Sequence, residues 1–101
     1  MDPIARWEGL LAAQPNNELA RFSLAKALFD TRRFAEARGH LATALAKKPD
    51  WMVVQILLGR CDLELGDRDA ARESFRAALR LAIDQHHEGP QAELEALLAE
   101  M

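Results

Sequence analysis

The chain has 101 residues, of which 50% are hydrophobic and 29% are charged, and its formal net charge is −3. This balance fits one soluble domain and gives no electrostatic case for binding nucleic acid or an anionic membrane, because both require a basic patch. Cys61 is the only cysteine, so the chain cannot form an internal disulfide. The sequence shows no secretory signal, and no run approaches the roughly 18 apolar residues of a membrane span. We therefore expect a cytoplasmic protein.

Helix-capping and helix-breaking residues divide the first half of the chain into three predicted helices. Asp2 precedes Pro3, and this pair is typical of a helix start. Pro15 ends the first helix, Asn17 caps the second and Pro49 ends the third. The predicted helices cover residues 3–14, 18–31 and 34–48.

The second half of the chain has three further predicted helices. The stretch WMVVQILLG at 51–59 is non-polar at eight of nine positions, but Asp50 and Gly66 flank it as a helix cap and a left-handed helix end, so we predict a helix over 51–65. Asp67 or Asp69 caps a fifth helix that runs towards His87. Gly89-Pro90 is expected to break it and to begin a sixth helix over 91–100.

The sequence repeats itself with a period of 34 residues, which indicates stacked helix pairs. At this separation small residues align with small residues, and large residues align with large residues about one helical turn away. The aligned pairs include Leu24 with Leu58, Ala25 with Gly59, Ala37 with Ala71, Leu41 with Phe75, Ala44 with Ala78 and Leu45 with Leu79. The first helix follows the same step through Trp7, Leu10, Leu11 and Pro15.

These positions resemble the tetratricopeptide repeat family. The resemblance implies an all-α fold, a right-handed α-α superhelix of six helices forming a single domain over 1–101. It divides the chain into a half repeat at 3–15, repeats at 17–50 and 51–84, and a C-terminal capping helix at 90–101. The chain departs from the family at its tryptophan position, which holds Arg21 and Gln55, and at its tyrosine position, which holds Leu28 and Asp62. Because a buried unpaired carboxylate is costly, we expect Asp62 to lie at a wet edge or to pair with an arginine.

The resemblance also implies a groove, since in this family the first helix of each pair lines the concave face. The residues expected there are Leu19, Phe22, Lys26, Phe29, Val53, Ile56, Arg60 and Leu63. Their apolar surplus favours a non-enzymatic protein-interaction adaptor that binds a peptide or helix in the groove. The alternative is a structural homo-oligomerisation module, such as a homodimer, whose groove is its own interface, or a groove covered by the last helix.

Other chemistry has little support in the sequence. No nucleophile motif, phosphate loop or dinucleotide fingerprint occurs, so we expect no enzyme activity and no cofactor. His86-His87 with Asp84 and Glu88 offers metal ligands within one helical turn, but the helix dipole explains histidines at a helix end more simply, and we expect no metal. The groove lacks the asparagine with which the family's chaperone-binding branch grips a C-terminal carboxylate.

Overall fold

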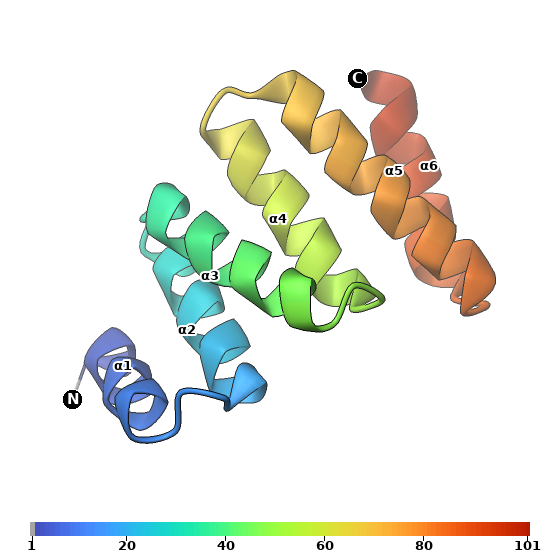
Figure 1. Cartoon of the computed structure of the whole chain (residues 1–101). Helices are drawn as coiled ribbons and strands as arrows, with labels where there is room; N and C mark the ends of the chain where they lie inside the picture. Colours follow the sequence, from blue (N-terminus) through green and yellow to red (C-terminus); the bar gives the residue numbers. More distant parts are fainter. Residues whose placement is uncertain (1) are drawn as a thin grey trace.

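The computed structural model describes residues 2–101, and these residues form six α-helices and no strand. The molecule is elongated, with extents of 40 × 28 × 21 Å, because the helices stack in chain order into a helical superhelix (Figure 1). The predicted all-α fold of six helices is confirmed. The helices are α1 (Pro3–Ala13), α2 (Glu18–Asp30), α3 (Phe34–Lys47), α4 (Met52–Glu64), α5 (Arg68–Asp84) and α6 (Glu88–Glu100).

Each helix packs on its neighbours in the chain, and α2 also touches α4. Two apolar clusters form the core. The first joins α1 to α4 and contains Leu24, Leu28 and Leu41, all essentially without exposed surface, while the second joins α4 to α6 around Phe75. The small repeat positions Ala25, Ala37, Ala44, Ala71 and Ala78 are fully buried, so the 34-residue period does mark close helix contacts.

Three turns end the helices in the same way. In each turn, the amide of the third residue after the helix donates to the carbonyl five positions earlier: Arg33 to Leu28, Asp67 to Asp62 and His87 to Ala82. The residue before each donor is left-handed, with φ of 64° at Arg32, 84° at Gly66 and 58° at His86. The predicted left-handed helix end at Gly66 is therefore confirmed.

Most of the predicted caps are present. The side chains of Asp2, Asn17 and Asp67 accept hydrogen bonds from the amides of Ile4, Ala20 and Ala70, respectively. The cap predicted at Asp50 is wrong. The turn after Pro49 brings the Trp51 amide onto the Lys48 carbonyl, so that Trp51 precedes α4 and no side chain caps the helix.

The predicted start of the last helix is also wrong. α6 begins at Glu88, which places Gly89 and Pro90 inside its first turn instead of before it. A proline fits there because the first amides of a helix have no partner within the helix. The chain reverses earlier, at Gln85–His87. α6 then packs on α5, within the second apolar cluster, and Figure 1 shows it behind α5, so it does not fold back over α2.

The predicted pairing of Asp62 with an arginine is confirmed. Its side chain is 2% exposed, and Nε of Arg38 lies 2.6 Å from its Oδ1. The Ser74 hydroxyl donates to the other carboxylate oxygen at 3.5 Å. The carboxylate is thus buried between α3 and α5 with both oxygens in contact with donors.

Candidate functional site

A hollow of about 270 Å³ lies between α2 and α4, and it brings together six of the eight predicted groove residues. We call it the α2–α4 groove. It is lined by Phe22, Lys26, Phe29 and Asp30 of α2 and by Val53, Ile56, Leu57 and Arg60 of α4.

The helical period explains why these side chains meet. Phe22, Lys26 and Phe29 follow one another at steps of four and three residues, which keeps them on one face of α2. Adding one repeat length to Phe22 and Lys26 gives Ile56 and Arg60, which take the same positions on α4. Because α2 and α4 run in the same direction, side by side, the two faces form one surface (Figure 1).

Two predicted residues do not line this groove. Leu19 is 72% exposed at the start of α2, and Leu63 is half-buried against the cluster around Phe75. Leu57 also lines the groove, although it was not among the eight predicted residues, and it is half-buried against the first apolar cluster.

Aromatic contacts fix the walls of the groove. The Phe22 ring packs on Trp51 with centroids 5.5 Å apart, and the Phe29 ring meets the edge of Phe34 at 5.2 Å. Val53 is nevertheless 49% exposed, and no residue of α6 lines the groove. Within residues 2–101 the groove is therefore open to solvent and walled by side chains that are held in place.

Two cations stand over this apolar surface. Lys26 and Arg60 are exposed, and neither has a carboxylate within 4 Å among the described residues. Long cationic side chains commonly lay their stems on apolar surface while the charge stays in water. Asp30, at the C-terminal end of α2, supplies the carboxylate of the lining.

A second hollow adjoins the groove on the other side of α2, and we call it the α1–α2 hollow. It measures about 410 Å³ and is lined by Trp7, Phe22, Ser23, Lys26, Ala27 and Asp30. Phe22, Lys26 and Asp30 belong to both hollows, so α2 forms a ridge between them. Sequence reasoning treated Trp7 as part of the helix framework alone, because a half repeat gives no pattern for a groove.

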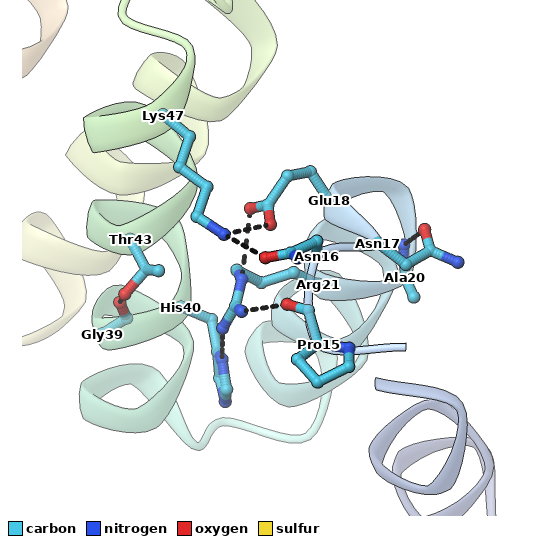
Figure 2. A network of polar contacts seen from close by, with 10 residues as sticks. All are labelled: Pro15, Asn16, Asn17, Glu18, Ala20, Arg21, Gly39, His40, Thr43 and Lys47. Carbon is cyan, nitrogen blue, oxygen red and sulfur yellow. Dashed lines mark hydrogen bonds and ion pairs between the residues drawn. The ribbon is translucent and has the colours of Figure 1, made fainter. Parts of the chain in front are cut away.

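A polar network ties α2 to α3 and to the chain before it (Figure 2). Lys47 of α3 donates to Asn16 and to Glu18, each at 3.2 Å. Arg21 donates to the Pro15 carbonyl at 3.1 Å and meets Nδ1 of His40 at 3.4 Å. Burial first, and then the Arg21 charge, lowers the pKa of His40 below its ordinary value. Arg21, at the family's tryptophan position, thus holds elements together by polar contacts.

Potential metal ligands are not clustered in the part of the chain that the structure describes. Residues 2–101 contain no group of three or more histidine, cysteine, aspartate or glutamate side chains placed to hold a metal ion. Burial raises the pKa of the Cys61 thiol to about 11, so it is protonated at neutral pH and is a poor nucleophile. No helix over these residues is long and apolar enough to cross a membrane.

The model of a tetratricopeptide repeat matches residues 4–54, about half of the chain, which include α1, α2 and α3. The chain belongs to the tetratricopeptide repeat family. Repeats of this family generally mediate protein–protein interactions, and the family's members are typically non-enzymatic adaptors.

Two known proteins resemble this tetratricopeptide repeat chain. The solution structure of protein BPP2914 from Bordetella parapertussis has a TM-score of 0.84 and 31% sequence identity over 96% of this chain and 84% of that one. Anaphase-promoting complex subunit 3 of Dictyostelium discoideum is 37% identical over 68 residues, 67% of this chain. The chain spans 7% of the length of that subunit.

Proposed function

We propose that this protein is a non-enzymatic adaptor that binds a peptide or helix of a protein partner in the α2–α4 groove. The observation that carries the proposal is the exposed apolar lining around Val53, which is 49% exposed beside the rings of Phe22 and Phe29. Pockets that bind ligands are mostly apolar with a few placed polar groups, and this groove has that character.

A substitution at Val53 tests this proposal with little risk to the fold. The protein would be panned against a displayed library of short random peptides, and an enriched peptide would then be labelled and titrated by fluorescence anisotropy. We expect Val53→Asp to weaken binding at least about tenfold, because a carboxylate would have to be desolvated in an apolar groove. Its thermal midpoint should change little, since exposed positions usually shift stability by about 0.5 kcal/mol.

Ile83→Asp is the matched control, because Ile83 is 47% exposed on α5 and lines neither hollow. It should bind like the parent. Equal binding by Val53→Asp would overturn the groove as the binding site. Light scattering of both proteins tests homo-oligomerisation: a parent dimer that Val53→Asp splits, with no enriched peptide, would favour the groove as a self-interface.

A further inference from the structure

The ridge between the two hollows points to the chemistry of the occupant. We propose, resting on the function proposed above, that the partner segment is an acidic peptide with two apolar anchors. One anchor fills the α2–α4 groove, the other fills the α1–α2 hollow beside Trp7, and a carboxylate between them meets Lys26.

The size of the hollows favours anchors over a buried helix. At about 270 Å³ and 410 Å³, each accommodates one or two large side chains, whereas a helix with its side chains is about 10–12 Å across. The two hollows share Phe22, Lys26 and Asp30 of α2, and from this ridge one continues onto α4 and the other onto α1. They therefore accept two side chains of one segment that crosses α2.

The charges along this path favour an acidic segment. Lys26 lines both hollows and Arg60 lines the α2–α4 groove, while Arg6 of α1 lines neither hollow but lies over the Trp7 ring at 5.4 Å. None of these three cations has a carboxylate within 4 Å among residues 2–101. Asp30 is the carboxylate that lines both hollows, so the path keeps a positive excess on a chain whose net charge is −3. Complementary charge of this kind sets partner choice and association rate.

The width of one helix sets the spacing of the anchors. Packed helices lie about 8–10 Å apart, and we take this distance as the spacing of the two anchors, because one hollow continues from the α2 ridge onto α1 and the other onto α4. Two side chains on one face of a peptide are about 9 Å apart at a step of three residues in a polyproline conformation, and about 10 Å apart at a step of seven in a helix. The enriched peptides should therefore carry apolar residues three or seven positions apart, with aspartate or glutamate between them.

The test uses the panned peptides and two variants of the full chain. We expect Lys26→Glu to weaken the binding of an acidic, two-anchor peptide about tenfold or more, and Arg80→Glu to leave it unchanged. Arg80 is exposed on α5, lines neither hollow and gives the same change of charge. Ser23→Leu places an apolar side chain in the α1–α2 hollow, where Ser23 contributes to the lining. It should weaken the two-anchor peptide several-fold and leave a peptide with its second anchor replaced by alanine unaffected.

The outcomes separate this inference from the proposed function. The inference would be overturned if the enriched peptides lacked carboxylates, or if they bound Lys26→Glu as well as the parent. In either case, weaker peptide binding by Val53→Asp would still support the groove as the binding site. Peptides indifferent to Val53→Asp would overturn both. Displacement of the peptide by a single-stranded oligothymidine would assign the cations and aromatic rings to nucleic acid instead. Circular dichroism of each variant checks that the fold is kept.

Discussion

Arg38 on α3 and Asp62 on α4 form an ion pair that is exposed at one end and buried at the other. Nε of Arg38 lies 2.6 Å from Oδ1 of Asp62, and the side chains are 43% and 2% exposed, respectively. The hydrogen bond to this carboxylate raises the pKa of Arg38 above its ordinary value. This pair explains how Asp62 can occupy the family's tyrosine position. The buried carboxylate is paired with Arg38, whose own charge stays partly in water.

Removing the cation should therefore destabilise the fold. In Arg38→Met, the buried carboxylate of Asp62 keeps only the Ser74 hydroxyl at 3.5 Å. We expect the free energy of unfolding to fall by about 1–3 kcal/mol, which urea denaturation would measure. Arg33→Met is the control, because its partner Glu36 is exposed and such pairs contribute about 0–1 kcal/mol. An equal loss in both variants would contradict the special role of the buried carboxylate.

Gly59 should resist substitution because of Phe75. A Cβ added to Gly59 would lie 2.6 Å from Cε1 of the Phe75 ring, so Gly59→Ala forces the ring to move. We expect a loss of about 1–3 kcal/mol in unfolding free energy, although alanine favours helices. The control Gly39→Ala, where a Cβ meets nothing within 4 Å, should instead gain about 0.5–1 kcal/mol.

The other repeat suggests how to rescue Gly59→Ala. One repeat length earlier, Ala25 and Leu41 stand where Gly59 and Phe75 stand, and both are buried. We expect Phe75→Leu to offset part of the loss in Gly59→Ala, so that the double variant loses less than the sum of the single ones. Thermal melts of the four proteins measure this coupling, and strict additivity would argue against contact between the two positions.

The three left-handed helix ends should respond in opposite directions. Gly66 has φ of 84°, so Gly66→Ala should cost about 1 kcal/mol, the usual penalty for a side chain in this conformation. Arg32 and His86 already bear that penalty, with φ of 64° and 58°. Arg32→Gly and His86→Gly should therefore be neutral or stabilising by up to about 1 kcal/mol, as measured by thermal midpoint. A clear loss in both would indicate that their side chains contribute more than their backbone strain costs.

His40 should make stability depend on pH. Its pKa in the folded protein lies below the ordinary value of 6.5, chiefly because of burial, with Arg21 lowering it further and Glu36 and Glu8 opposing. The unfolded chain therefore binds the proton more readily, so the stability that His40 contributes is present above about pH 6.5 and is lost as the pH falls towards the folded pKa.

His40→Gln keeps a side chain that Arg21 can donate to but removes the titration. We expect its urea midpoint to fall less than that of the parent between about pH 7 and pH 5. His87→Gln is the control, since His87 is exposed before α6. A parallel fall in the parent and His40→Gln would place the pH dependence on other groups.

The sequence predicted the helices well because their signals are local. The caps at Asp2, Asn17 and Asp67 and the left-handed Gly66 each depend on residues within one turn. The same local reading was wrong at Gly89-Pro90. A proline is compatible with both a break and a first turn, and the chain reversal at His86 decided between them.

The candidate site was predictable only where the repeat applies. Six groove residues meet because the period of 34 places Phe22 and Ile56, or Lys26 and Arg60, at equivalent positions. The α1–α2 hollow was not foreseen, because Trp7 belongs to a half repeat with no preceding copy to compare. The contact of Arg21 with His40 was also missed, since it joins residues 19 positions apart that share no helical face.

The packing of each helix on its neighbours in the chain has a consequence for how this protein can grow. Within residues 2–101, α2 and α4 are the one pair of non-consecutive helices in direct contact. Inserting a further helix pair would therefore disrupt few contacts between helices. In a chain with a second copy of residues 17–50 inserted after Asp50, the first helix of the copy would pack on α3, where α4 packs now. The second helix of the copy would present to α4 the same surface that α3 presents to it now. The modular stack can thus be lengthened by one unit, and its groove extended by one more row of side chains, without redesign of either end.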